Sequence, residues 1–242
     1  MLRLLDGCVK LNRKKNENQT IYWIIYILDI FDNRMYQIVK RTVVFNWDFN
    51  QVLNDAILND IASCDKIIFN NCRDLNICLR LNNKYAEGYY YAWYGSRFNK
   101  SLDNLPSSII DLDSGSNFNK SLDNLPFGII NLTLGFYFNQ EIDNLPHKIR
   151  NLTLGTCFNQ CLDNLPSSII NLTLGYCFNQ CLDNLPHSIN KITFEPNSGF
   201  YVDFNQEIKK IPRNLTLIDL SQIPNKSHLK KEFGKFNVEI IE

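Results

Sequence analysis

Apolar side chains recur through the middle of this chain with a period of 20 residues. A unit this short cannot enclose a core of its own, so each copy has to pack its apolar face against the next copy. The phrase Phe-Asn-x-x-(Leu/Ile)-Asp-Asn-Leu-Pro marks five copies, which begin at Phe98, Phe118, Phe138, Phe158 and Phe178. The pattern therefore predicts a stacked solenoid that is stabilised by contacts between neighbouring coils.

Each copy is expected to contain one short strand, a glycine and a proline. Leu172 and Leu174 bracket Thr173, and this alternation predicts a strand with both leucines pointing inward and the threonine outward. At the glycine that follows, we expect the backbone to turn with positive φ or to pass close to the neighbouring coil. The proline favours a turn or a short helical segment on the side opposite the strand. These residues are Gly95, Gly115, Gly135, Gly155 and Gly175, and Pro106, Pro126, Pro146, Pro166 and Pro186.

The same pattern divides the chain into five segments. We expect an N-terminal cap resembling a β-hairpin over 1–48, degenerate repeats over 49–94, five regular repeats over 95–194, an insertion loop and a terminal repeat over 195–225, and a C-terminal cap over 226–242. The hairpin is expected between 21–30 and 35–45, two runs rich in β-branched and aromatic residues around Asp32-Asn33. Phe49-Asn50 opens a degenerate copy that reaches its strand at Ile67-Ile68-Phe69.

The spacing of apolar residues within a copy fits a known repeat. Ile169-x-x-Leu172-x-Leu174-x-x-Cys177 matches the leucine-rich-repeat phrase L-x-x-L-x-L-x-x-(N/C) and then departs from it. With Phe-Asn at every corner and Leu-Pro after it, residues 95–194 resemble the FNIP-repeat family, leucine-rich-repeat relatives abundant in giant viruses of amoebae and in social amoebae. The unit is slightly shorter than the family's, and no Ile-Pro directly follows Phe-Asn. The resemblance implies a leucine-rich-repeat-like solenoid with a parallel β-sheet on one face and irregular returns on the other.

Function is inferred from this fold by analogy. Repeat solenoids usually work by offering surface, so the leading hypothesis is a non-enzymatic scaffold that binds a protein partner through the solenoid face. The resemblance implies an alternative, a substrate-recognition adaptor in host ubiquitination, because related viral proteins often join these repeats to an N-terminal F-box. Residues 1–48 lack the Leu-Pro-rich helical opening of an F-box, and three short helices there, instead of a β cap, would favour the adaptor. A structural protein that self-assembles through an uncapped end is the third hypothesis.

Comparison of the copies with one another indicates where a partner would bind. When the five copies are aligned, the positions of Phe, Leu, Pro and Asp-Asn barely vary, whereas the residue after the glycine changes from copy to copy. Positions free of the packing constraint can diversify toward a partner, and an exposed aromatic residue can anchor an interface. Drift on an unconstrained surface would explain the same variation. The predicted partner-binding residues are Thr133, Phe136, Thr153, Thr156, Thr173 and Tyr176.

Composition argues against several other partners. The 242 residues carry 25 Lys and Arg against 25 Asp and Glu, so no net field gathers nucleic acid or acidic lipid. The most apolar run, 21–30, is about half as long as the roughly 20 residues that span a membrane. No secretory signal is evident at the N-terminus. We therefore expect an intracellular, cytoplasmic protein, in the cytoplasm of a host cell if the resemblance extends to the viral proteins.

Four cysteines raise the question of a metal site. Cys157-x-x-x-Cys161 and Cys177-x-x-x-Cys181 repeat one coil apart, so four sulfur atoms could converge on zinc. Their spacing matches no standard zinc ribbon, and a buried cysteine is an ordinary small apolar residue. We expect reduced, metal-free thiols. Oxidation of Cys157 with Cys177 stays open, because neighbouring strands would hold them near disulfide distance.

No pattern predicts catalysis or a cofactor. His147 and His187 share a slot that other copies fill with serine or phenylalanine, and no phosphate loop or nucleophile elbow is present. An aspartate in every copy could suggest a calcium ladder, but the Gly-rich phrase of calcium-binding β-helices is absent. We expect each aspartate to bind backbone N–H groups of its own turn. These aspartates are Asp103, Asp123, Asp143, Asp163 and Asp183.

Overall fold

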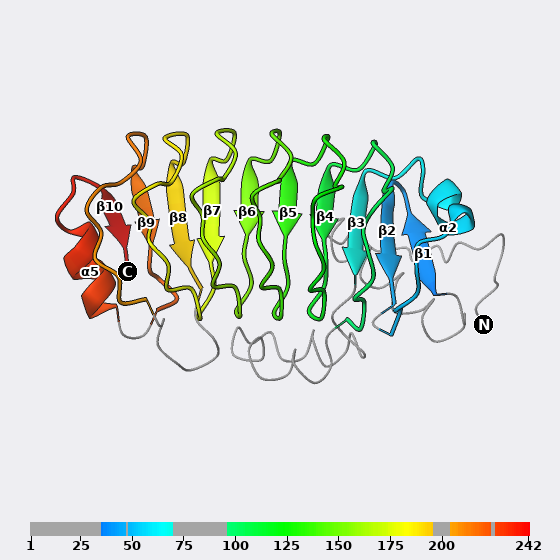
Figure 1. Cartoon of the computed structure of the whole chain (residues 1–242), viewed down its shortest axis with the longest axis horizontal. Coiled ribbons are helices and arrows are strands. Elements are labelled where there is room, and N and C mark those ends of the chain that lie inside the picture. Colours follow the sequence, from blue (N-terminus) through cyan, green and yellow to red (C-terminus); the bar gives the residue numbers. More distant parts are fainter. Residues whose placement is uncertain (1–34, 47, 70–95, 196–203, 224–225) are drawn as a thin grey trace, which may run out of the picture.

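The computed structural model describes residues 35–46, 48–69, 96–195, 204–223 and 226–242. Within them ten strands form one sheet in sequence order, and the coils stack along it into a solenoid (Figure 1). Every neighbouring pair of strands is parallel except the first. The prediction of a leucine-rich-repeat-like solenoid with a parallel sheet is confirmed.

The described elements are short. The strands are β1 (Tyr36–Val39), β2 (Thr42–Phe45), β3 (Lys66–Phe69), β4 (Asp111–Asp113), β5 (Asn131–Thr133), β6 (Asn151–Thr153), β7 (Asn171–Leu174), β8 (Lys191–Phe194), β9 (Leu217–Asp219) and β10 (Glu239–Ile241). The helices are α2 (Asp55–Asp60) and α5 (Ser227–Phe233). Turns connect the strands of the regular coils on the side opposite the sheet. The prolines begin these turns: in one coil the backbone N–H of Ile169 donates to the carbonyl of Pro166 at 3.2 Å.

Strands β1 and β2 form an antiparallel hairpin at the start of the sheet. Tyr36 lies opposite Phe45, and the connection passes through Lys40, whose φ is 59°. The hairpin that the sequence predicts, with its turn at Asp32-Asn33, needs residues 21–30, which lie outside the described residues. The run that was expected to be its second strand instead folds back on itself, because Lys40-Arg41 provides a two-residue connection between two four-residue strands.

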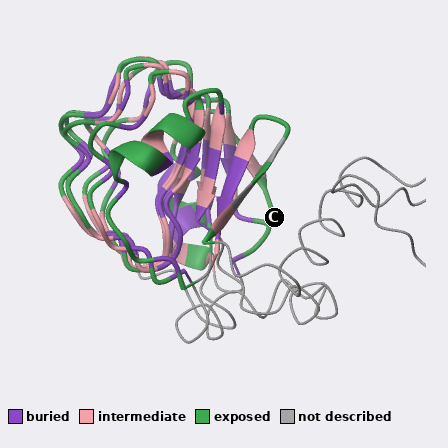
Figure 2. Cartoon of the chain, turned by 90° about the vertical axis from the view of Figure 1, so that its right-hand side faces the viewer, coloured by how far each residue is buried: buried purple, intermediate pink, exposed green. Residues whose placement is uncertain are grey.

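The core lies between the sheet and the returns. In β7 the side chains of Leu172 and Leu174 are 1% and 0% exposed, while Thr173 points outward and is half-buried. The same inward-and-outward alternation holds in every central strand, and the end-on view shows the buried residues lining the inside of the coil (Figure 2). This alternation follows from the period of two in a β-strand, and it confirms the predicted orientation of these side chains.

A column of stacked phenylalanines runs the length of the solenoid. Rings on neighbouring coils lie 5.9 to 6.3 Å apart between centroids and within 15° of parallel. The column consists of Phe49, Phe98, Phe118, Phe138, Phe158, Phe178 and Phe204. Its two outer members show that residues 49–69 and the coil after 204 belong to the same stack as the regular copies, although their spacing in the sequence differs.

Asparagines hold the Phe-Asn corners together. The side-chain oxygen of Asn139 accepts a hydrogen bond from the backbone N–H of Asn159 at 2.8 Å, and the same contact recurs between each pair of neighbouring coils from Asn50 to Asn205 at 2.8 to 3.0 Å. Glutamine side chains such as Gln160 donate to the same oxygens. These asparagines therefore join each corner to the backbone of the neighbouring coil.

The glycines allow neighbouring backbones to approach closely. A Cβ atom on Gly155 would lie 2.1 Å from the carbonyl oxygen of Gly135, and one on Gly175 would lie 2.4 Å from that of Gly155. Among the described glycines only Gly115 has positive φ, at 72°. The close approach of neighbouring backbones therefore explains why glycine recurs at this position. A left-handed backbone conformation, the other reason expected from the sequence, applies to Gly115 alone among the described glycines.

The last coil is covered by α5. Phe233 is fully buried against Phe194, with ring centroids 6.0 Å apart. The carboxylate of the buried Glu232 accepts the backbone N–H of Ile208 at 2.9 Å and so links α5 to the last coil. Lys235 and this amide lower the pKa of Glu232. Strand β10 then pairs with β9 and extends the sheet by one strand.

Candidate functional site

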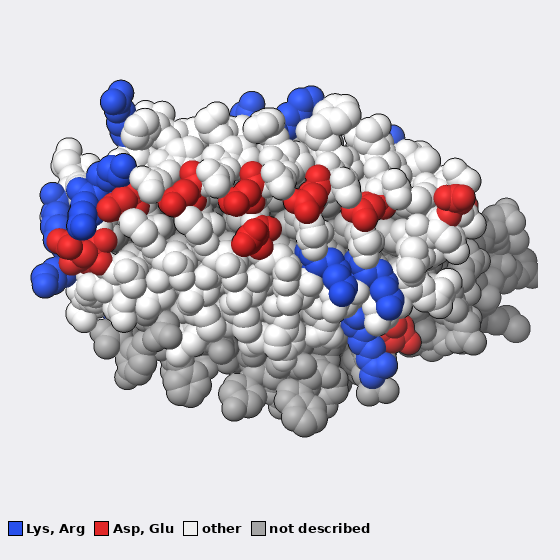
Figure 3. Space-filling view, in the orientation of Figure 1, with Lys and Arg blue, Asp and Glu red and all other residues white. Residues whose placement is uncertain are grey.

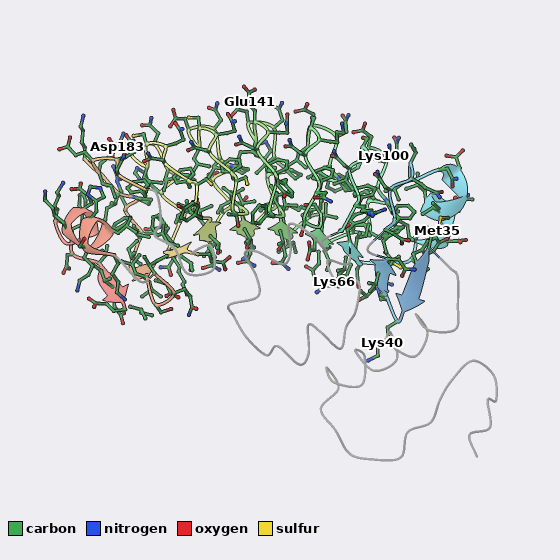
Figure 4. The ribbon with its side chains drawn as sticks, turned by 90° about the horizontal axis from the view of Figure 1, so that it is seen from below. Met35, Lys40, Lys66, Lys100, Glu141 and Asp183 are labelled. Carbon is green, nitrogen blue, oxygen red and sulfur yellow. The ribbon has the colours of Figure 1, made fainter. Side chains whose placement is uncertain are left out.

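The outward side of strands β4 to β8 forms a continuous polar surface, which we name the sheet face. Its residues point away from the core on either side of the buried central residue of each strand. They are Asp111, Asp113, Asn131, Thr133, Asn151, Thr153, Asn171, Thr173, Lys191 and Thr193. In Figure 4 Lys66 of the neighbouring β3 marks the sheet side, and Glu141 and Asp183 lie on the opposite side.

The three predicted threonines lie side by side at the centre of the sheet face. The strand register places Thr133 beside Thr153 and Thr153 beside Thr173. Neighbouring strands in a sheet are about 4.8 Å apart. The threonines therefore form one row of hydroxyl and methyl groups that crosses three coils.

A second row on the sheet face was not singled out from the sequence. The side-chain amide of Asn171 donates to the side-chain oxygen of Asn151 at 2.6 Å, and that of Asn151 donates to Asn131 at 2.5 Å. Asn131 in turn donates to Asp111. The signal that could have found this row is the Asn-Leu-Thr triplet, which is repeated in three consecutive copies and which places asparagine and threonine on the same side of the strand.

The charged side chains at the two ends of the sheet face are held by neighbours. At one end Lys66 lies 4.0 Å from the Asp111 carboxylate, and Asp113 accepts the backbone N–H of Gly115 at 2.9 Å. Burial raises the pKa of Asp113, against the opposite effects of that N–H group and of Lys66. At the other end Lys191 lies 2.8 Å from Asp219 and lowers its pKa to about 2.

The residues after the glycines form one border of the sheet face. Phe136, Thr156 and Tyr176 are all half-buried. The carbonyl of Phe136 accepts the backbone N–H of Cys157 at 2.9 Å, and that of Thr156 accepts the backbone N–H of Cys177 at 2.8 Å, so this border is part of the framework that joins the coils. The ring of Phe136 meets that of Tyr137 edge-on at 4.8 Å, and Tyr137 is 39% exposed. The border therefore offers aromatic surface, and Tyr137 is an exposed member that the sequence analysis did not name.

The residues that precede the strands form the other border. The backbone N–H of Arg150 donates to the carbonyl of Ile130 at 2.9 Å, and the N–H of Ile170 donates to the carbonyl of Arg150 at 2.8 Å. These three residues consequently lie side by side on neighbouring coils. Arg150 is exposed and the two isoleucines are half-buried.

The aspartates lie on the opposite side, along the returns, where acidic side chains form a row (Figure 3). Asp123 accepts the side-chain amide of Asn144 at 2.8 Å, and the contact recurs between Asp103 and Asn124 and between Asp163 and Asn184. The expectation that each aspartate binds the N–H groups of its own turn is therefore wrong for these three. The next coil places an asparagine amide within reach of each, so the row is a link between coils.

The four paired cysteines occupy two columns. Cys157 and Cys177 are half-buried, and Cys161 and Cys181 are exposed; all four are free thiols. Burial and the neighbouring thiol of Cys177 raise the pKa of Cys157 to about 11. Among the described residues no group of three or more His, Cys, Asp or Glu side chains is arranged to hold a metal ion. Nor is any helix in this part of the chain long and apolar enough to cross a membrane.

Comparisons with known proteins agree with this architecture. The sequence model of the FNIP repeat family matches residues 118–157 and 158–195. Comparison with curated proteins gave no match. Among solved structures the chain is similar to CroV588, a giant-virus protein described as a novel circular LRR protein structure, with a TM-score of 0.50 and 26% identity over 86% of this chain. The similar region is 34% of CroV588, so this chain spans about a third of that protein. Residues 118–195 are thus FNIP repeats, carried by a leucine-rich-repeat-like solenoid.

Proposed function

We propose that this chain is a non-enzymatic scaffold that holds a protein partner on its sheet face. Repeat solenoids present extended surfaces, and leucine-rich-repeat folds commonly bind proteins. The partner-binding residues of this proposal are Thr133, Phe136, Thr153, Thr156, Thr173 and Tyr176, together with the asparagine row beside the threonines.

The main support for the proposal is that the asparagine row on the sheet face is held in place by hydrogen bonds between its members and still has donors and acceptors free. A side-chain amide has two N–H donors and two acceptor lone pairs. Asn151 uses one donor on Asn131 and one lone pair on Asn171, which leaves one of each for a partner. Its bonds to both neighbours fix its direction, so less conformational entropy is lost when a partner binds.

The aromatic border supplies the second element that protein interfaces need. Hot spots of binding are enriched in large, partly rigid side chains that are surrounded by groups able to exclude water. Phe136, Tyr137 and Tyr176 lie beside the neutral central rows, whereas the paired charges lie at the two ends. This arrangement is typical of a contact surface with an aromatic anchor.

The test blocks the sheet face without disturbing the core. Peptides are selected on the wild-type protein from a phage-displayed random library, and their affinities are then measured for Thr153→Arg and for Glu141→Arg. Thr153 is at the centre of the sheet face and Glu141 is exposed on the opposite side (Figure 4). We expect Thr153→Arg to lose binding and Glu141→Arg to retain it. Equal affinity for both variants, each folded by circular dichroism, would contradict the proposal.

A further inference from the structure

The column of residues that precedes the strands holds one arginine among aliphatic neighbours. At this position the coils carry Ile110, Ile130, Arg150, Ile170 and Asn190. The backbone hydrogen bonds from Arg150 to Ile130 and from Ile170 to Arg150 place the arginine between the two isoleucines. A cation is thus held between two isoleucines at the middle of this border of the sheet face.

Within the part of the chain that the structure describes, Arg150 has no counter-ion, unlike the lysines at the two ends of the sheet face. Lys66 is near Asp111, and Lys191 contacts Asp219. None of the ion pairs or side-chain hydrogen bonds in the described part of the chain uses the guanidinium group of Arg150. The central residues beside it are the neutral asparagines and threonines. Among the residues that the structure describes, the centre of the sheet face therefore carries a positive charge, that of Arg150, with no acidic side chain paired to it.

The guanidinium group of Arg150 indicates which class of ligand would bind at this border of the sheet face. Its planar guanidinium group binds a carboxylate through two parallel hydrogen bonds, and it keeps its charge when it is partly desolvated. Arginine is also enriched among the residues that dominate protein interfaces. Nucleic acid is a less suitable ligand, because its binding depends on several cations that neutralise several phosphates, and Lys66 and Lys191 are already paired with carboxylates.

We propose that the partner segment on the sheet face carries an aspartate or glutamate that pairs with Arg150, flanked by apolar side chains that pack on Ile130 and Ile170. The segment crosses β5, β6 and β7 along the border that precedes the strands. This inference rests on the proposed function, since it names the chemistry of the partner that the sheet face holds.

The experiment uses the same random peptide library, selected separately on the wild-type chain and on Arg150→Glu. Peptides from the wild type are expected to be enriched in Asp or Glu next to apolar residues, and those from Arg150→Glu in Lys or Arg. Wild-type peptides should bind Arg150→Ala about tenfold or more weakly, the effect of losing hydrogen bonds to a charged group. Lys148→Ala is the matched control, because Lys148 is also an exposed cation, two residues away, with its Nζ over the ring of Phe127 at 5.4 Å.

The two proposals fail in different ways. Peptides that lose affinity for Thr153→Arg but bind Arg150→Ala as well as the wild type would overturn the acidic partner and leave the sheet face as the binding surface. Peptides that bind Thr153→Arg unchanged would overturn the proposed function itself. An equal loss in Lys148→Ala and Arg150→Ala would show a general effect of positive charge and would also contradict the pairing with Arg150. A library that yields no peptide sensitive to Thr153→Arg or Arg150→Ala counts against both proposals.

Discussion

The side-chain oxygen of Asn159 accepts the backbone N–H of Asn179, one coil further along, at 2.8 Å. The same oxygen accepts the side-chain amide of Gln180 at 3.0 Å. A single side chain therefore satisfies one backbone donor and one side-chain donor of the next coil, at a corner where the strands cannot provide an acceptor. The repeat of this contact from coil to coil explains why Phe-Asn is kept in every copy.

Removing this acceptor should be costly. Asn159→Ala leaves the N–H of Asn179 without its partner, and we expect a loss of about 1–3 kcal/mol in the free energy of unfolding. Asn144→Ala is the control, since its amide donates to Asp123 on the exposed side. A urea denaturation series should show a much smaller loss for Asn144→Ala. Equal losses would mean that the corner contact is no more important than the exposed one.

The close approach of coils at the glycines predicts an effect of a single methyl group. In Gly155→Ala the new Cβ would lie 2.1 Å from the carbonyl oxygen of Gly135, so the coils must separate, and we expect a loss of about 3 kcal/mol or more. In Gly128→Ala the nearest atom, the carbonyl oxygen of Ser107, would be 3.0 Å away, and a small shift relieves the contact. Thermal unfolding compares the two. Similar melting temperatures would refute the account of the glycine column.

The orientation of side chains in β7 predicts unequal effects of neighbouring truncations. Leu172 is 1% exposed in the core, so Leu172→Ala should cost about 2–5 kcal/mol, as buried leucine truncations do. Thr173 points outward from the same strand, and Thr173→Ala should cost less than about 1 kcal/mol. Denaturant melts of both variants measure the difference, and comparable losses would rule out the inward and outward assignment.

The contact between Lys191 and Asp219 predicts sensitivity to acid. Lys191 lowers the pKa of Asp219 to about 2, whereas an unfolded aspartate titrates near a pKa of about 3.9. A depressed pKa stabilises the fold above the unfolded value, and this contribution is lost as pH falls from about 4 toward 2. Asp219→Asn lacks this titration, so its urea midpoint should fall less than that of the wild type between pH 4 and 2. A parallel decline in both proteins would show that Asp219 is not responsible.

Much of the fold follows from the period of the sequence. A repeat of 20 residues requires coil-on-coil packing, and the Leu-Thr-Leu alternation determines which side chains of β7 are buried. Phe49-Asn50 and Phe204-Asn205 take their places in the stack despite irregular spacing. Their phenylalanines stack on the phenylalanine of the adjacent regular coil, and their asparagines take part in the same corner hydrogen bond as the regular copies. Local chemistry is thus enough to identify a coil.

Contacts between coils were harder to predict. The aspartates could bind their own turns or the next coil, and only the stacked geometry decides that Asp123 meets Asn144. The asparagine row on the sheet face depends in the same way on register, which places Asn131, Asn151 and Asn171 side by side. The environment of Arg150 was not predicted, because the residue at this repeat position differs between copies. The contacts of such a variable position become known only when the neighbouring coils are placed in three dimensions.

Photo-crosslinking tests the central claim, that the sheet face is the binding surface, most directly. A benzophenone amino acid replaces either Tyr176, on the border of the sheet face, or Glu141, which lies on the opposite side (Figure 4). Each protein is irradiated with a peptide selected on the wild type. The account predicts a covalent adduct from position 176 and none from position 141, as measured by mass spectrometry of the intact protein. An adduct from position 141 alone would contradict it.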